Sequence, residues 1–453
     1  MKAHLEEKRR FFAAGGTRSY AYRREQLEKL RALLREKQTD ITEALRADLG
    51  KPVFEAYLSE VGFCLSEVNH ALEHLEGWME EQPVTTPLSL FPARSSILRE
   101  PKGVVLIIAP WNYPFQLVVA PFIAALAAGN CAVLKPSELA PETATLVERL
   151  VSQSFSEELV SVVTGGSHVA KTLLEEKFDH IFYTGGASVG RSVMKAAAEN
   201  LTPVTLELGG KSPCLVDEDV RLSLAARRIA WGKFWNAGQS CIAPDYVLVS
   251  SGRADELVAE IEGSVRRFFG EEPLDSPDYA RIVNERHFAR LSAYLGEGRI
   301  AFGGQTDRER LYVAPTALVD VPERASVLEE EIFGPILPIV PYESLDEAIR
   351  LAGRHPDPLA LYVFSRRPDT VERVLREVPS GGVSVNDTLV HFSSSTLPFG
   401  GRGASGTGRY HGRFGFETFS HQRAVVRGAT LFDPPLRYPP YGSKLRWVKR
   451  LLG

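Results

Sequence analysis

The sequence of 453 residues contains only four cysteines, and no two of them lie close together. Cys64, Cys131, Cys214 and Cys241 have neither the density of a disulfide framework nor the spacing of a zinc site. This excludes a small secreted disulfide scaffold and a cysteine-rich metal centre. The distribution is typical of a protein from a reducing compartment, and we expect no metal.

An excess of positive charge is also missing. The sequence has 53 Lys and Arg residues and 57 Asp and Glu residues, so its net charge is −4 and gives no positive electrostatic field for binding nucleic acid. The longest apolar run, Phe115 to Ala128, is interrupted by Pro121 and is shorter than the ~20 residues of a membrane span. The N-terminus carries charges without the apolar core of a secretory signal. We therefore expect a soluble, cytoplasmic protein without a nucleic-acid partner.

The length predicts two or three domains. Amphipathic helices fill the first 82 residues, and apolar strands then alternate with helices. This alternation indicates βαβ units and a Rossmann-like parallel sheet, so residues 1–82 and 101–209 form the first predicted α/β domain. Its strands are predicted at residues 103–109, 131–135, 159–163, 180–184 and 204–208, and its later helices at 141–154, 169–176 and 189–200.

A second α/β pattern covers residues 210–390 and predicts a second domain. Its predicted strands are residues 246–249, 336–340, 360–365 and 382–385, and its predicted helices are 222–235, 254–269, 345–352 and 370–377. Strands at 95–99 and 416–427 are expected to pair as a two-stranded arm. Residues 83–100 and 391–430 would then form a bridging arm for oligomerisation, followed by a basic tail at 431–453.

Polar residues follow the predicted strands, where ligands bind in doubly wound sheets. Asn112 lies between two prolines, and its amide is suited to an oxyanion hole, although taken alone this asparagine is better explained as a turn residue. Lys135 and Glu138 would suit the hydroxyls of a ribose or the solvated start of a helix. Glu207 ends the fifth strand beside two glycines, where it can act as a base.

A glycine turn, Thr184-Gly-Gly-Ala-Ser-Val-Gly190, connects the fourth strand to its helix. Bare backbone and a helix N-terminus at such a turn can approach a phosphate. The turn is not a GxGxxG motif, and by itself it is a weak signal.

Cys241 stands in the segment Gly238-Gln-Ser-Cys241, where the second domain opens. A lone cysteine is more often a small buried hydrophobe than a nucleophile. Here the same crevice is expected to hold Asn112, Glu207 and the glycine turn. Together these residues would provide a nucleophile, an oxyanion donor, a base and a binding surface for a dinucleotide.

With these segments assembled, the chain resembles the aldehyde dehydrogenase superfamily over nearly its whole length. The matching segments, in the family's order, are Pro110-Trp-Asn-Tyr-Pro-Phe115, Lys135-Pro-Ser-Glu138, Thr184-Gly-Gly-Ala-Ser-Val-Gly190, Glu207-Leu-Gly-Gly-Lys211, Gly238-Gln-Ser-Cys241, Glu330-Glu-Ile-Phe-Gly-Pro335 and Pro398-Phe-Gly-Gly401. The short N-terminus and the segments Leu201-Thr-Pro-Val-Thr205, Trp231-Gly-Lys-Phe234 and Tyr410-His-Gly412 resemble the class 3 and fatty-aldehyde branch.

The resemblance implies NAD(P)-dependent oxidation of an aldehyde to a carboxylic acid. Cys241 would be the nucleophile that forms a thiohemiacetal and then a thioester, Asn112 would hold the oxyanion, and Glu207 would be the general base. The first domain would bind NAD, and the second would be the catalytic domain. The implied cofactor-binding residues are Trp111, Lys135, Glu138, Gly185, Gly186, Gly190, Leu208, Glu331 and Phe333.

Several expectations stay open at this stage. Glu138 should repel a 2′-phosphate and favour NAD, with NADP possible, and Gly186 stands where many relatives have serine. Tyr113, Trp231 and Trp235 either wall a substrate tunnel or serve packing, and the aldehyde can be aliphatic, aromatic or terpenoid-like. His391 and His411 are expected in structural or substrate-loop roles rather than in proton transfer.

Two functional alternatives also remain: a cofactor-independent esterase or acyl transferase at the same cysteine, and a non-catalytic binding protein on this scaffold. The intact trio of Cys241, Glu207 and Asn112 argues against the last. By analogy with class 3 relatives we expect a homodimer. The basic tail Lys444 to Leu452 can contact a membrane surface, although packing on a partner subunit or disorder is favoured.

Overall fold

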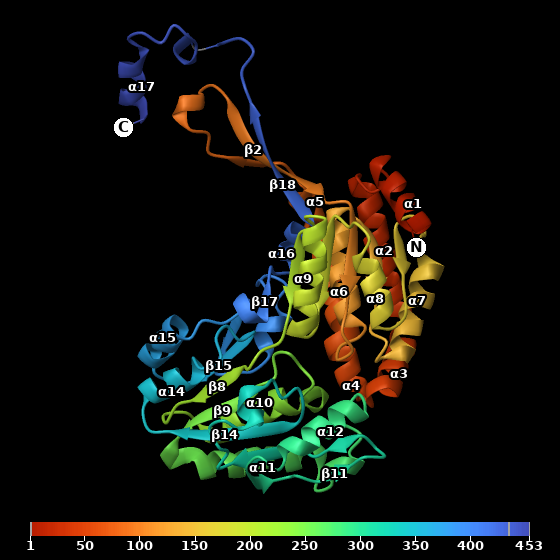
Figure 1. The fold of residues 1–453 in the computed structure, drawn as a ribbon, viewed down its shortest axis with the longest axis vertical. Helices are drawn as coiled ribbons and strands as arrows, with labels where there is room; N and C mark the ends of the chain where they lie inside the picture. Colours follow the sequence, from red (N-terminus) through yellow and green to blue (C-terminus); the bar gives the residue numbers. More distant parts are fainter. Residues whose placement is uncertain (1, 434, 453) are drawn as a thin grey trace.

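A six-stranded sheet forms the first half of the protein in the computed structural model, which describes residues 2–433 and 435–452 (Figure 1). Its order is β17-β7-β6-β3-β4-β5, and its strands are parallel except for the short edge strand β17. The strands are β3 (Val104–Ile108), β4 (Cys131–Lys135), β5 (Val160–Val162), β6 (His180–Thr184), β7 (Val204–Glu207) and β17 (Gly406–Thr407).

Alternate residues of the central strands pack on opposite faces of this sheet, because successive side chains of a strand point in opposite directions. Val105 and Ile107 of β3 join the large core beneath α2, α5, α6 and α7. Val104, Leu106 and Ile108 join a smaller core beneath α1, α8 and α9. Helices therefore cover both faces, which explains why every residue of β3 is apolar and buried.

The helices of this half begin with three long amphipathic segments. Gly50 ends the third of them in a left-handed conformation (φ 59°), and Gly129 ends α6 in the same way (φ 86°). The bounds are α1 (Lys2–Ala13), α2 (Tyr20–Glu36), α3 (Gln38–Leu49), α4 (Val53–Ala56), the π-helical turn η1 (Tyr57–Gly62), α5 (Phe63–Met79), α6 (Gln116–Ala128), α7 (Pro141–Ser154), α8 (Ser167–Leu174), α9 (Ala187–Glu199) and α16 (Gly412–Thr418).

A seven-stranded sheet forms the second half, with the order β10-β13-β14-β9-β8-β15-β16. All of its pairs are parallel except that of β10 with β13. The strands are β8 (Pro213–Val216), β9 (Tyr246–Ser250), β10 (Arg299–Phe302), β13 (Thr316–Val319), β14 (Ile336–Tyr342), β15 (Ala360–Phe364) and β16 (Gly382–Val385), and the hairpin β11 (Thr306–Asp307) and β12 (Tyr312–Val313) lies beside them.

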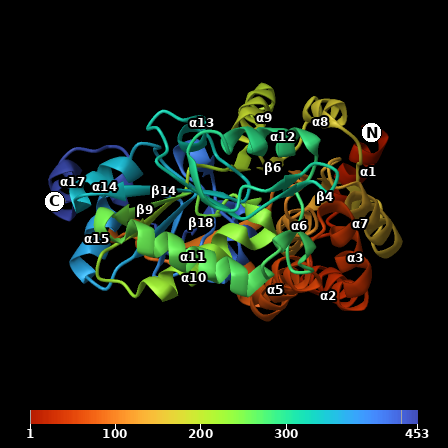
Figure 2. The ribbon, with the colours of Figure 1, turned by 90° about the horizontal axis from the view of Figure 1, so that it is seen from below.

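Helices flank this second sheet as well (Figure 2). Seen from below, α10 and α11 lie together along one side of the sheet, whereas α12 lies on the opposite side. The bounds are α10 (Leu222–Phe234), α11 (Ala254–Phe269), α12 (Glu285–Tyr294), α13 (Ser326–Glu329), α14 (Leu345–Ala352) and α15 (Pro368–Glu377).

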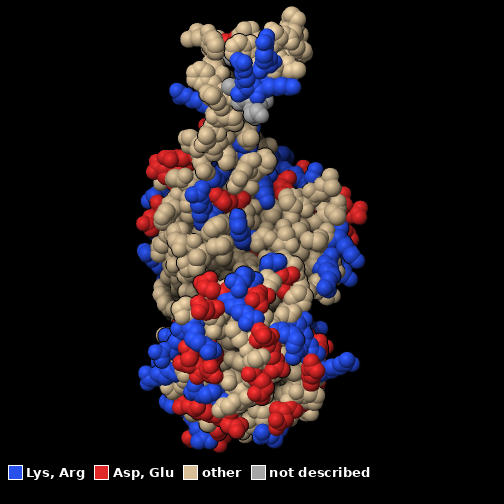
Figure 3. All heavy atoms as spheres, turned by 90° about the vertical axis from the view of Figure 1, so that its left-hand side faces the viewer, with Lys and Arg blue, Asp and Glu red and all other residues tan. Residues whose placement is uncertain are grey.

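A three-stranded antiparallel sheet projects from the body as an arm (Figure 1). It consists of β1 (Gln82–Val84), β2 (Arg94–Pro101) and β18 (Ser420–Arg427), and β2 pairs with β18 along all eight residues of each strand. Beyond the arm the chain ends in α17 (Lys444–Leu452), whose basic side chains gather at the tip of the molecule (Figure 3).

The α/β fold with two parallel sheets confirms the predicted fold class. The arm corrects two details, because it has a third strand, β1, and because residues 416–418 are helical rather than extended. Phe416 is buried beside α6 and α5, so the predicted strand begins only at Ser420. No helix among residues 2–433 and 435–452 combines the length and apolarity needed to cross a membrane.

Candidate active site

The turn that carries Cys241 follows directly after α10. Asn236 (φ 52°), Ala237 (φ 50°) and Gly238 (φ 73°) are three successive residues in the left-handed region, which is costly for the first two. A Cβ on Gly238 would lie 2.2 Å from the carbonyl oxygen of Gly334, so only glycine fits there. Cys241 follows this turn and lines a cavity together with residues at the carboxyl ends of the first sheet's strands.

Hydrogen bonds from distant segments hold this strained turn. The backbone N–H of Asn236 donates to Glu55 at 2.9 Å, and the Asn236 side chain donates to the carbonyl of Asn112 at 2.9 Å. The Gln239 side chain donates to the carbonyl of Arg281 at 2.9 Å and accepts from the N–H of Val283 at 3.0 Å. These four hydrogen bonds can offset the backbone strain of the turn.

Asn112 lies in the loop after β3 and is 2% exposed. Its side-chain amide donates one hydrogen bond, 3.0 Å long, to the carbonyl of Gln239. An asparagine amide carries two N–H groups, so the second remains for a ligand in the cavity that Asn112 and Cys241 both line. This arrangement matches the predicted oxyanion donor.

Glu207 ends β7 beside Thr184 of β6, its register partner. It is 2% exposed, and neither carboxylate oxygen has a hydrogen-bond partner among the described residues. Burial without a neighbouring cation raises the pKa of Glu207 well above its usual value. A carboxyl group in such a site is suited to accept a proton from water near neutral pH.

Cys241 is partly exposed, unlike the other three cysteines, which are buried in the core. Removal from bulk water raises the pKa of Cys241, and the nearby carboxylates of Glu331 and Glu207 raise it further. The backbone N–H groups of Cys241 and Ile242 act in the opposite direction by hydrogen bonding to the sulfur. Backbone donors are therefore one source of thiolate stabilisation in this site.

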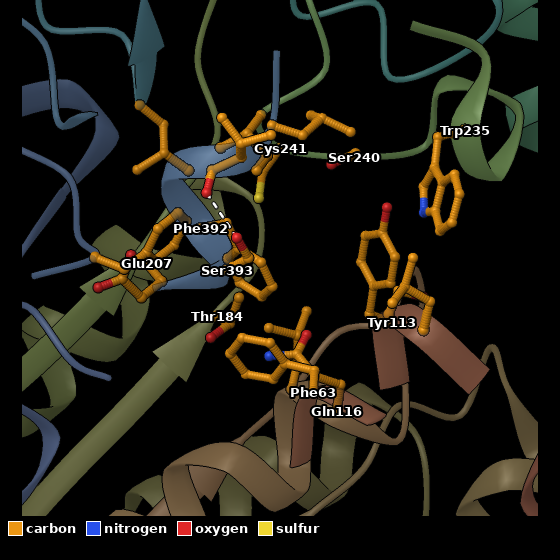
Figure 4. Close-up of a pocket in the computed structure, with 18 of the residues that line it drawn as sticks. Phe63, Tyr113, Gln116, Thr184, Glu207, Trp235, Ser240, Cys241, Phe392 and Ser393 are labelled. Atoms are coloured by element: carbon orange, nitrogen blue, oxygen red, sulfur yellow. Dashed lines mark hydrogen bonds between the residues drawn. The ribbon is translucent and has the colours of Figure 1, made fainter. Parts of the chain in front are cut away.

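A tunnel of about 330 Å³ leads to Cys241 from one side (Figure 4). The sulfur points into the tunnel, with Phe63 and Gln116 below it and Tyr113 and Trp235 to one side. The three predicted pocket residues, Tyr113, Trp231 and Trp235, all line it. The other apolar lining residues are Leu58, Phe63, Leu117, Leu208, Ile242, Leu359, Leu389, Val390, Phe392 and Phe399.

A second cavity, of about 580 Å³, reaches Cys241 from the carboxyl ends of the first sheet. Thr184, Glu207 and Cys241 line both cavities, so the two meet at the thiol. All but one of the predicted cofactor residues line this crevice, namely Trp111, Lys135, Glu138, Gly185, Gly186, Leu208, Glu331 and Phe333. Gly190 instead packs inside α9, where a Cβ would lie 2.8 Å from Leu208.

The crevice fits a dinucleotide. Gly186 opens the thirteen-residue helix α9, and a Cβ there would meet no atom within 4 Å, which leaves the helix N-terminus accessible. Lys135 and Glu138 are paired at 2.7 Å within the crevice. Glu331 also lines the crevice, one of its buried carboxylate oxygens has no partner among the described residues, and burial raises the pKa of Glu331 to about 8.

The sequence did not reveal several polar groups of this site. Thr184, Gln116 and Tyr410 line the tunnel with buried side-chain atoms that have no partner among the described residues. His411, by contrast, stacks on Phe399 at 5.1 Å, and burial lowers its pKa to about 3, so it is neutral packing. Only the motif Tyr410-His-Gly412 could have drawn attention to Tyr410.

Lys51, Glu55 and Glu60 were missed altogether. These three charged residues lie between α3 and α5, are at most 6% exposed, and contact the two loops that carry Asn112 and Cys241. Charged residues on amphipathic helices are normally solvated, so the sequence alone offered no signal for them.

Comparison with known proteins identifies relatives of the whole chain. A sequence model described as the aldehyde dehydrogenase family matches residues 3–425. The 4,4'-diaponeurosporen-aldehyde dehydrogenase of Staphylococcus aureus is 46% identical, with 97% of this chain and 96% of that protein covered. Aldehyde dehydrogenase family 3 member B1 of Mus musculus is 47% identical, with 97% and 94% covered.

Solved structures agree with these relatives. The substrate-bound state of Staphylococcus aureus AldH is similar with a TM-score of 0.98 and 44% identity, covering 100% of this chain and 99% of that one. An indole-3-acetaldehyde dehydrogenase in complex with NAD+ is similar with a TM-score of 0.86 and 27% identity, covering 94% and 88%.

Proposed function

Because the chain belongs to the aldehyde dehydrogenase family, with relatives in its class 3 branch, we propose that Cys241, Asn112 and Glu207 perform the family's reaction here. The protein is an oxidoreductase that converts an aldehyde to the carboxylic acid with NAD(P)+. The observation that carries the residue roles is the meeting of the two cavities at Cys241.

The thiol of Cys241 loses its proton to solvent, and the resulting thiolate attacks the aldehyde carbonyl that reaches it through the tunnel. The free amide N–H of Asn112 and the backbone N–H of Cys241 hold the oxyanion of the resulting thiohemiacetal. When bound, the nicotinamide cofactor supplies the hydride acceptor, and the residues proposed to hold it are those of the crevice, with Lys135 and Glu138 toward a ribose.

A thioester on Cys241 then remains to be hydrolysed. Glu207 is proposed to take a proton from the attacking water, whose oxygen bonds to the thioester carbon as the carbon–sulfur bond breaks. The carboxylic acid leaves, and the proton gained by Glu207 returns to solvent. The unpaired carboxylate oxygens of Glu207 in the shared wall of both cavities support this role.

Two measurements test these roles. Asn112→Ala should lower kcat by about 10²–10³-fold, the usual cost of one oxyanion donor, while the affinity for NAD+ measured by fluorescence titration stays within about twofold. A panel of aldehydes followed by NADH absorbance should show turnover. An Asn112→Ala enzyme with unchanged kcat would refute the oxyanion role.

We propose an apolar aldehyde as substrate, because the tunnel is lined by aromatic and aliphatic side chains and by no Lys or Arg. The Staphylococcus aureus relative is named for a diaponeurosporen aldehyde, and an apolar aldehyde of this kind is consistent with the apolar lining of the tunnel. We also propose NAD over NADP, because Glu138 would face a 2′-phosphate across the ribose. Catalytic efficiencies with both cofactors test this, and a clear NADP preference would overturn it.

We propose a cytoplasmic homodimer that uses the arm. The strand β18 has no partner on its outer side among the described strands, and Phe91 and Val426 of the arm are 65% and 57% exposed. The tail is proposed to pack on the partner subunit rather than on a membrane. Light scattering tests the dimer, and a tail-dependent flotation of the protein with anionic liposomes would contradict the tail's assignment.

A further inference from the structure

A buried ion pair lies directly behind the proposed oxyanion donor. The ammonium of Lys51 contacts the carboxylate of Glu60, and both side chains are 0% exposed. Lys51 follows the left-handed end of α3, and Glu60 lies in the π-helical turn η1. Turns with π-helical geometry are rare in proteins as a whole, and those that occur are often found at functional sites. Tyr57 and Leu58 of the same turn remain 43% and 49% exposed, so the turn directs its acid inward.

The pair holds the loop that carries Asn112 at two points. Lys51 donates to the carbonyl of Asn112 at 3.1 Å. The other oxygen of Glu60 accepts from the backbone N–H groups of Phe115 and Gln116 at 2.9 and 3.0 Å, where α6 begins. The loop between β3 and α6 is therefore tied at Asn112 and at its exit, by two side chains that are nine residues apart.

These contacts complete the restraint of Asn112. Its carbonyl accepts from Lys51 and from Asn236, and its side chain donates to Gln239. Hydrogen bonds therefore hold both the backbone carbonyl and the side-chain amide of Asn112, and together they set the direction of its remaining amide N–H. Lys51 also lies 4.4 Å above the ring of Tyr113, which walls the tunnel.

We propose that Lys51 and Glu60 are positioning residues for the reaction, which hold the Asn112 amide in the direction that stabilises the oxyanion. The two opposite charges are in contact, so the pair adds little net field at Cys241, and its contribution is geometric. Misplacement of a reacting group by about 1 Å can cost about 100-fold in rate. This inference rests on the proposed oxyanion role of Asn112.

Single substitutions would mix function with folding, because removing one partner leaves a buried unpaired charge. The informative variant is therefore Lys51→Met/Glu60→Gln, which removes both charges at similar volume, and in which the glutamine oxygen can still accept from the start of α6. Arg367→Met/Asp217→Asn is the matched control, because it also removes both charges of one ion pair, and the Arg367–Asp217 pair lines neither cavity at Cys241.

The measurements are thermal unfolding, NAD+ affinity by fluorescence titration, and kcat/KM for hexanal oxidation and for hydrolysis of p-nitrophenyl acetate. The double variant should stay folded and bind NAD+ within about twofold of the parent, while both kcat/KM values fall about tenfold or more, since both reactions form an oxyanion. Arg367→Met/Asp217→Asn should leave both values unchanged.

A cycle with Asn112→Ala separates this inference from the function on which it rests. In the Asn112→Ala background the double substitution should cost no further activity, because the group it positions is gone. A folded double variant with parental kcat/KM would overturn the positioning role while Asn112→Ala remains impaired. A fully active Asn112→Ala enzyme would instead refute the oxyanion role itself, and equal losses in both backgrounds would show that Lys51 and Glu60 act independently of Asn112.

Discussion

Each methylene added to a straight-chain aldehyde is expected to raise kcat/KM about fourfold until the chain fills the tunnel. Burying one methylene in an apolar site stabilises by about 0.8 kcal/mol, and 1.36 kcal/mol corresponds to a tenfold change in rate. The tunnel of about 330 Å³ is walled by side chains such as Phe63, Trp231 and Trp235, so each added carbon finds apolar contacts rather than water.

The assay is the initial rate of NADH formation with unbranched aldehydes from propanal to dodecanal, at saturating NAD+ and below the critical micelle concentration of each substrate. A plot of log kcat/KM against carbon number should rise linearly and then level off. Trp231→Ala should move the plateau to longer chains. The rings of Trp231 and Trp235 pack with their centroids 5.4 Å apart in the tunnel wall, so removing the Trp231 ring would enlarge the tunnel.

An aldehyde with a carboxylate at its far end provides the matched control. Its kcat/KM should fall below that of the unbranched aldehyde of equal length, because the tunnel lining contains no Lys or Arg to pair with the charge. A flat chain-length profile, or a preference for the charged substrate, would refute the apolar-tunnel reasoning.

Three further outcomes follow from the site. Cys241→Ser should lower turnover by on the order of 10³ or more, with NAD+ affinity retained in a fluorescence titration, and substantial turnover would exclude Cys241 as nucleophile. Glu207→Gln should slow thioester hydrolysis more than hydride transfer and give a stopped-flow burst of NADH. Because burial raises the pKa of Glu207, and the base acts when deprotonated, parental kcat should rise with pH above the usual carboxyl range, and this limb should vanish in the variant. Glu138→Ser should raise kcat/KM with NADP+ relative to NAD+, and an unchanged ratio would remove Glu138 as the determinant.

The sequence predicted secondary structure best where a single residue pattern determined the element. The strand Cys131–Lys135 and the helix Pro141–Ser154 have the predicted bounds, because the first is a buried run of four apolar residues that ends at Lys135 and the second begins at a proline and carries one apolar face. The strand Pro213–Val216 was not predicted, since it begins with proline, which is uncommon inside a sheet. Phe416 was taken for strand although it belongs to a short helix, because its apolar character fits both.

The site shows the same division. Motif residues such as Glu207 and Cys241 were identified because they follow strands or lie at a domain opening, and the structure brings them together. The contact between Lys51 and Asn112 spans 61 residues and depends on the π-helical turn. Neither sequence spacing nor side-chain type indicates such a pairing, so only the folded chain could reveal that these charges are buried.

The junction of the two cavities has a consequence for chemical labelling of the protein. Of the four cysteines, Cys241 alone lines the two cavities, and the other three are buried. An electrophile on an alkyl chain would arrive by the tunnel, whereas a small polar electrophile can also arrive by the crevice. NAD+ should therefore slow labelling by the polar reagent more than labelling by the alkyl reagent, so the ratio of the two labels reports occupancy of the cofactor site.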